Sequence, residues 1–221
     1  MKKHLSKKFS IVFYTLIVLL IIIITWTMWG NTALMTSEVT ISSNRIPSAF
    51  SGFRIAQVSD LHNSEFGKNN ARLLQMLSEN TPDIIVITGD LVDAQHTDID
   101  IALGFVKPVY YVTGNHEASL SNYSEFQMNL VALGVGVLEN QAVQLEQDGE
   151  RITLIGLSDP NFTIRGDMFG EVPAMVATKL ENLLDTESGY NILLSHRPEL
   201  FETYVNCGVD LVFSGHAHGG Q

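Results

Sequence analysis

Short apolar runs that end abruptly in polar residues are the feature that most limits how this chain can fold. Uninterrupted apolar runs of this length are typical of strands buried on both faces of a sheet. Segments with helical spacing alternate with them, which is typical of an α/β fold. The runs lie at residues 53–58, 84–88, 109–113, 152–157, 192–194 and 211–213, and helices are expected over 71–77, 121–133, 173–184 and 198–206.

One pair of strands is expected to be antiparallel. Asp148-Gly149 divides the segment 143–157, and an Asp-Gly pair between apolar runs is typical of a tight β-hairpin. Helical connections elsewhere favour parallel neighbours. The sequence therefore predicts mixed rather than purely parallel pairing.

Five clusters of polar residues follow these strands, at 59–62, 88–93, 113–117, 195–196 and 214–218. Ligands of α/β sheets bind beyond the carboxyl ends of the strands, so the five loops should meet in one crevice. Glycines at 89, 114 and 215 suit tight turns close to a bound ion. Imidazole, carboxylate and amide donors favour Mn, Fe or Zn over Ca. The candidate metal ligands are Asp60, His62, Asp90, Asn115, His196, His216 and His218.

Each cluster alone is more often a cap or a turn than a site. Five of them in order, each at the end of an apolar run, are not explained by packing, because strand ends do not require His and Asp. His4 and His96 lie outside the set and are expected to be solvated. Arg165 and Arg197 are candidates for gripping a phosphate, although a surface arginine is more often only solvated.

Residues 53–221 closely resemble the calcineurin-like metallophosphoesterases, whose ordered signature is D-x-H, G-D-x-x-D, G-N-H-[ED], H and G-H-x-H. The resemblance implies a sandwich of two mixed β-sheets flanked by helices. It also implies one metal held by Asp60, His62, Asp90 and His218, and a second held by Asp90, Asn115, His196 and His216, with Asp90 as the bridge. His116 would approach the leaving-group oxygen, oriented by Asp93. The membrane-anchored form resembles bacterial envelope phosphoesterases of the YaeI and YkuE type.

The expected function is hydrolysis of a phosphodiester or pyrophosphate bond with two divalent ions, Mn first and Fe or Zn as alternatives. Two ions about 3.5–4 Å apart clamp the phosphoryl oxygens, and a bridging hydroxide attacks phosphorus. A lipid or envelope-related substrate suits an anchored enzyme. The alternatives are a phosphomonoesterase, a nucleotide phosphodiesterase, or a binding module with impaired catalysis. A protein phosphatase is disfavoured, because the sequence shows no sign of an extended groove for an acidic substrate.

The N-terminus predicts a membrane anchor. Residues 1–8 contain four lysines and no acid, and no charged residue occurs over residues 9–37. About 20 apolar residues span a bilayer, so this stretch is long enough to do so. Lysines precede the apolar core, and Trp26 and Trp29 follow it. This order predicts a cytoplasmic N-terminus with the rest of the chain outside the cell membrane. The expected parts are a basic segment 1–8, an anchor 9–30, a linker and lead-in strand 31–51, and the phosphoesterase domain 52–221. A cleaved signal and a buried core helix are the alternatives, but no good cleavage site follows.

Charge disfavours a nucleic-acid partner. Residues 9–221 hold nine basic and 24 acidic residues, a formal charge of −15 that repels a phosphate backbone. Cys207 is the only cysteine, so no intrachain disulfide forms. The oligomeric state is open. The chain stops three residues after His218, whereas the resembled family continues with further strands, so a C-terminal truncation and weak metal retention are expected.

Overall fold

The structure is a computed structural model that describes residues 2–93, 108–164, 170–184 and 189–218. The chain divides into two units, Met1–Val39 and Thr40–Gln221. The first unit is dominated by α1 (Lys2–Thr32), within which Phe9–Thr27 has a mean hydropathy of 2.7 and is long and apolar enough to cross a membrane. This agrees with the predicted anchor.

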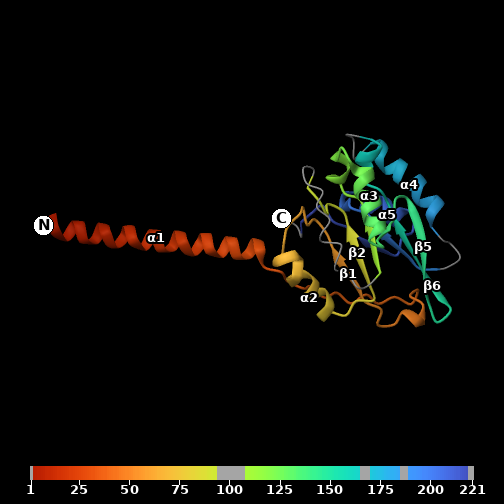
Figure 1. The fold of residues 1–221 in the computed structure, drawn as a ribbon, viewed down its shortest axis with the longest axis horizontal. Helices are drawn as coiled ribbons and strands as arrows, with labels where there is room; N and C mark the ends of the chain where they lie inside the picture. The colour runs from red at the N-terminus through yellow and green to blue at the C-terminus, as the bar shows by residue number, and fades with distance from the viewer. Residues whose placement is uncertain (1, 94–107, 165–169, 185–188, 219–221) are drawn as a thin grey trace. The chain divides into compact units, whose positions relative to one another are not determined.

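The second unit contains two four-stranded sheets (Figure 1). The first has the order β1 (Ile55–Val58), β2 (Ile84–Thr88), β3 (Val109–Val112) and β4 (Gly136–Val137). Helix α2 (Ala71–Glu79) connects β1 to β2, and α3 (Tyr123–Ala132) lies between β3 and β4. All three pairings in this sheet are parallel. This is expected of β1 with β2 and of β3 with β4, which are joined through helices.

The second sheet has the order β5 (Gln141–Gln147), β6 (Glu150–Gly156), β7 (Asn191–Leu194) and β8 (Leu211–Phe213). Helix α4 (Glu171–Leu183) lies between β6 and β7, and α5 (Phe201–Asn206) connects β7 to β8. Strands β5 and β6 are antiparallel and form the hairpin predicted at Asp148-Gly149, whereas the other pairings are parallel.

Alternate residues of the central strands supply two cores. Leu154 and Leu194 face a cluster shared with Val86 and Val112 of the first sheet, so this core lies between the sheets. Their neighbours Ile155 and Leu193 belong to a second cluster with residues of α4 and α5. Because both faces of β6 and β7 are covered, their residues form the continuous apolar runs seen in the sequence.

Short 3₁₀ turns complete the description: η1 (Ser48–Phe50), η2 (Lys68–Asn70), η4 (Glu117–Ser119), η5 (Pro160–Phe162) and η6 (Pro198–Leu200). The predicted α/β fold with two sheets flanked by helices is confirmed.

Two details of the sequence prediction were wrong. Only the second sheet is mixed among the described strands, because the hairpin is the one connection there too short for a helical crossover. The expected lead-in strand within 31–51 is not formed: α1 extends to Thr32, residues 33–47 have no helix or strand, and η1 follows. Val39 and Ile41 alternate with polar residues there, but their side chains are 77% and 47% exposed, so the segment lacks the buried face that stabilises a strand.

Candidate metal centre

The five polar loops meet at the carboxyl ends of the strands, as predicted. Asp60 and His62 follow β1, Asp90 follows β2, and Asn115 follows β3. His196 follows β7, and His216 and His218 follow β8. The ligating atoms of these His and Asp residues form overlapping groups in which all atoms lie within 4.8 Å of one another. Both sheets therefore contribute to one cluster of donors.

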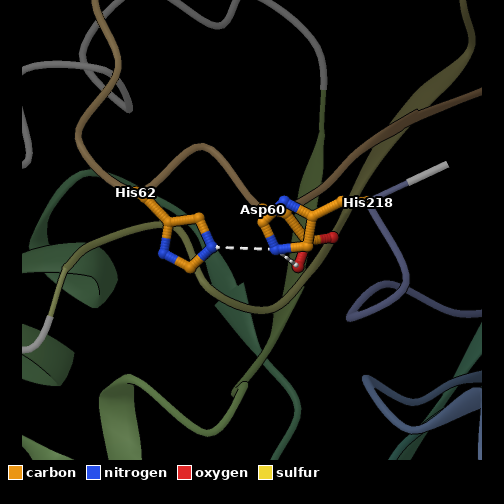
Figure 2. A group of neighbouring side chains, drawn as sticks. All are labelled: Asp60, His62 and His218. Atoms are coloured by element: carbon orange, nitrogen blue, oxygen red, sulfur yellow. Dashed lines mark hydrogen bonds and ion pairs between the residues drawn. The ribbon is translucent and has the colours of Figure 1, made fainter. Parts of the chain in front are cut away.

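Asp60, His62 and His218 form the first group (Figure 2). The Nε2 atoms of His62 and His218 lie 3.3 Å apart, and the two rings are stacked with an interplanar angle of 14°. Asp60 Oδ1 lies 3.6 Å from His218 Nε2. Two imidazole nitrogens that face each other need a proton or a cation between them.

Asp90 lies at the centre of the cluster and is only 2% exposed. Its Oδ1 accepts a hydrogen bond of 2.9 Å from the backbone N–H of His116. Its Oδ2 lies 3.3 Å from His196 Nε2 and 3.7 Å from His62 Nε2. Burial alone would raise the pKa of Asp90, but the hydrogen bond and charge of His196 outweigh it and lower the pKa to about 2. One carboxylate oxygen therefore faces imidazoles from both groups.

His196 is fully buried, and its orientation is fixed from behind. Its Nδ1 lies 2.8 Å from the carbonyl oxygen of Thr88, so this nitrogen carries the proton and donates it. In the metal-free protein a proton on Nε2 satisfies Asp90 Oδ2 and Asn115 Oδ1, the second of which lies 3.1 Å away. With that proton removed, the lone pair of Nε2 can bind an ion. His216 belongs to the same group as Asp90 and His196. Four donors from four strand ends, Asp90, Asn115, His196 and His216, thus form a second group.

Unusual backbone conformations concentrate in these loops. Asp60, His62, Asp90, His216 and His218 all have positive φ, from 44° to 66°. Such conformations cost about 1–3 kcal/mol each and persist where the surrounding structure imposes them. These backbone conformations accompany the clustering of the five side chains at the ends of the strands.

Two glycines allow the loops to approach closely. Gly89 has φ +92°, and a Cβ there would lie 2.6 Å from His196 Nδ1. A Cβ at Gly114 would overlap the carboxylate of Asp90. Any side chain at either position would displace a candidate ligand.

Glu117 and Asp159 are two buried carboxylates to which the sequence analysis gave no role. Glu117 is 0% exposed and accepts hydrogen bonds from backbone N–H groups beside Asp90. Burial, followed by the charge of Asp90, raises the pKa of Glu117. Asp159 pairs with Arg197. Glu117 is the last position of the G-N-H-[ED] signature, but no local pattern indicates what either carboxylate contacts, because these partners lie 25 or more residues away.

A surface arginine is more often only solvated, as noted from the sequence. Arg197 is instead buried. Its side chain is 7% exposed, with Nε 2.5 Å and Nη2 3.1 Å from the two oxygens of Asp159. The remaining Nη1 lies 3.2 Å from His216 Nε2 and 3.3 Å from Glu199 Oε1. Arg197 thus connects Asp159 to a candidate ligand. Arg165 and His96 lie outside the described residues, as does the side chain of His4.

His116 was expected to be oriented by Asp93, and no hydrogen bond joins Asp93 to the Nδ1 atom of His116. The Nδ1 of His116 is buried without a hydrogen-bond partner among the residues that the structure describes, while its Nε2 lies 3.9 Å from Asp90 Oδ2. The backbone N–H of Asp93 donates to Asn63 Oδ1 at 2.5 Å. The ring of His116 packs edge-on against His62, with centroids 4.4 Å apart.

The donor geometry fits divalent ions. Metal–nitrogen and metal–oxygen bonds of about 2.0–2.2 Å place neighbouring ligand atoms about 3.0–3.5 Å apart. The His62–His218, His196–Asn115 and His196–Asp90 separations of 3.3, 3.1 and 3.3 Å lie in this range. The buried carboxylates of Asp90 and Glu117 also place negative charge that a cation would offset.

The pKa of His62 predicts how acid affects the metal-free fold. Burial, opposed by Asp90 and reinforced by His116 and His218, lowers this pKa below 6.5. The unfolded chain therefore takes up the proton first, so folding stability at His62 is lost as pH falls through about 6.5. We expect the melting temperature in chelator to drop less between about pH 7.5 and pH 5.5 in His62→Gln than in the wild type. The opposite contribution of His196 is common to both proteins. Equal drops would contradict the prediction.

Comparison with protein families agrees with this geometry. The model of the calcineurin-like phosphoesterase family matches residues 53–220, which include all seven candidate ligands. The match covers both sheets and every polar loop of the cluster.

Curated relatives carry related names. The chain is 34% identical over 200 residues to the uncharacterized metallophosphoesterase YkuE of Bacillus subtilis, covering 84% of this chain and 65% of YkuE. It is 31% identical over 198 residues to a transmembrane protein with metallophosphoesterase domain of Danio rerio, covering 83% of this chain and 44% of the relative. The chain thus spans less than two thirds of either relative.

Among solved structures, the phosphopantetheinyl hydrolase of Mycobacterium tuberculosis is similar, with 18% identity and a TM-score of 0.47. The similar region covers 75% of this chain and 83% of the hydrolase.

Proposed function

Because the chain belongs to the calcineurin-like phosphoesterase family, we propose that it is a dinuclear metal-dependent hydrolase of a phosphodiester or pyrophosphate bond. The observation that carries the proposal is the position of Asp90, whose Oδ2 faces imidazoles of both donor groups at 3.3 and 3.7 Å. A carboxylate shared between two groups of ligands is the arrangement of a two-metal site.

The residues divide between two ions as follows. Asp60, His62 and His218 would hold one ion together with Asp90, and Asn115, His196 and His216 would hold the other together with Asp90. Mn is the first choice, with Fe or Zn as alternatives, since the donors are imidazole nitrogens and oxygens. When bound, such a pair of ions polarises the phosphoryl oxygens and lowers the pKa of water.

The protein's own side chains orient the donors and move the proton. The Thr88 carbonyl accepts the Nδ1 proton of His196, so the Nε2 atom of His196 stays available as a metal ligand. His116 is 36% exposed and therefore accessible to a substrate. In its protonated form it would donate a proton from Nε2 to the departing oxygen. We keep Asp93 as a proposed orienting residue for His116.

The proposed location is a membrane, with the N-terminus in the cytoplasm and the phosphoesterase unit outside. The lysines before α1 and the tryptophans near its end support this orientation. Attachment to a bilayer raises the effective concentration of an enzyme at lipid-linked substrates. This argument favours a lipid or envelope precursor as substrate, and a phosphomonoester or nucleotide diester is the alternative.

An assay of the full chain in detergent tests the function. The protein is stripped with chelator, reloaded with Mn²⁺, Fe²⁺ or Zn²⁺, and offered a monoester, a diester and a nucleotide-sugar lipid. We expect metal-dependent hydrolysis of the diester or pyrophosphate bond. Preference for the monoester would support the alternative substrate class, and no metal-dependent hydrolysis of any substrate would contradict the proposal.

The proposed role of His116 predicts a dependence on the leaving group. Replacement by Asn should leave the metal content unchanged and slow hydrolysis of an alkyl diester by about 10²–10⁴-fold, the usual contribution of a general acid. The loss should shrink for a nitrophenyl diester, whose leaving group needs no proton. Turnover of both substrates by the two metal-loaded proteins measures this. An equal loss for both substrates would contradict the acid role.

A further inference from the structure

Glu117 is a fully buried carboxylate that the proposed reaction does not use. It lies on η4, two residues after Asn115, and is 0% exposed. A buried carboxylate is costly unless its oxygens are well satisfied. No lysine or arginine in the part of the chain that the structure describes forms an ion pair with it. Its partners are instead backbone N–H groups.

Four N–H groups from two loops converge on this carboxylate. Oε1 accepts from Leu91 at 2.8 Å and from Val92 at 3.3 Å. Oε2 accepts from Asp90 at 3.0 Å and from Gly114 at 2.8 Å. Three of the donors are consecutive along the loop after β2, and successive N–H groups that point to one anion form a backbone nest. The fourth belongs to the loop after β3, so Glu117 joins the two loops.

The nest is linked to the conformation of Asp90. Asp90 has φ +50°, a strained conformation for a residue with a side chain. Bonding of its N–H and of the next two N–H groups to Glu117 offsets that strain. In this conformation Asp90 Oδ1 accepts from the N–H of His116, and Oδ2 is left facing His62 and His196.

We infer that Glu117 is a positioning residue, which holds the loops of Asp90 and Asn115 in ligating geometry without contacting an ion. The inference rests on the proposed function of the site. Both ligands belong to the donor group that shares Asp90, and Gly114, the fourth donor to Glu117, directly precedes Asn115. A shift of either loop would move a ligand of that group. A shift of Asp90 would also disturb the first group, because Asp90 is the proposed bridge.

The test compares Mn²⁺ affinity in three full-length variants in detergent. Glu117→Gln keeps the shape but replaces one acceptor oxygen by an amide NH₂ group, and each of the two oxygens faces two N–H donors. Loss of a residue that supports metal ligands typically costs 10–100-fold in affinity, so we expect Mn²⁺ binding to weaken by about 10–100-fold. Glu117→Asp keeps both oxygens and the charge, so it should weaken binding less. This variant also tests the inference where Glu117→Gln does not fold.

Asp210→Asn is the matched control. The side chain of Asp210 is 7% exposed, accepts the backbone N–H of Asn191 at 2.8 Å and pairs with Arg45, but it lies at the amino ends of β7 and β8. Its loss should lower the melting temperature of the metal-free protein and leave Mn²⁺ affinity within about twofold, because it supports no ligand.

The outcomes separate the two proposals. Weaker Mn²⁺ binding in both Glu117 variants, with normal binding in Asp210→Asn, supports positioning. Wild-type affinity in Glu117→Gln, or an equal loss of affinity in Asp210→Asn, would overturn the role of Glu117 alone. A wild-type chain that takes up none of Mn²⁺, Fe²⁺ and Zn²⁺ would overturn the proposed function and this role together.

Discussion

Replacement of Asp90 by alanine is expected to remove both metal ions at once. Its Oδ2 lies 3.3 Å from His196 Nε2 and 3.7 Å from His62 Nε2. Among the described residues, no other carboxylate oxygen faces both donor groups at these distances. Two ions supply several kcal/mol of transition-state stabilisation, so turnover should fall by on the order of 10³-fold or more. Elemental analysis counts the ions in each variant.

His62→Ala is the control for this prediction. His62 belongs to the first donor group and has no proposed role in the second, so its loss should mainly weaken one ion. Elemental analysis should therefore find fewer ions in Asp90→Ala than in His62→Ala. An Asp90→Ala variant that retains two ions per chain would show that the bridge is wrongly assigned.

The convergence of the ligands was predictable because it follows from topology. His62 and His218 are 156 residues apart, yet both follow strands, and the carboxyl ends of strands in an α/β fold meet at one edge. The strand at 84–88 was predicted with its observed bounds, since five fully buried residues leave an unbroken apolar run. The two-residue β4 was missed, because Gly136–Val137 is too short to show any periodicity.

The supports behind the ligands were not predictable. The contacts of Glu117 with the loop after β2 span 25 to 27 residues, and they depend on the strained backbone at Asp90. Asp159 precedes Pro160, a pair that reads as a local turn, and it does accept the N–H of Asn161 as a cap. That the same carboxylate also neutralises Arg197 depends on packing between distant segments, about which local pattern says nothing.

Among the substitutions proposed here, Asp159→Asn is expected to lower the free energy of unfolding the most. The pair is buried, with Arg197 7% and Asp159 0% exposed, and two hydrogen bonds of 2.5 and 3.1 Å join the groups. Removing Asp159 leaves the buried guanidinium of Arg197 with only the 3.3 Å contact to Glu199, and loss of one partner of a buried pair typically costs about 3–5 kcal/mol. Urea unfolding of the metal-free protein measures the change. Because Arg197 also contacts His216, metal binding should weaken as well.

Two comparisons distinguish an uncompensated charge from general damage. The double variant Asp159→Asn/Arg197→Met removes the charge together with its partner, so it should be more stable than Asp159→Asn alone. Glu146→Gln breaks the exposed pair of Glu146 with Arg151, in which both side chains are 61% exposed. Exposed pairs contribute roughly 0–1 kcal/mol, so this change should be small. If Asp159→Asn destabilised the fold no more than Glu146→Gln, the buried pair would not be holding Arg197 beside the site, and the contact with His216 would need another support.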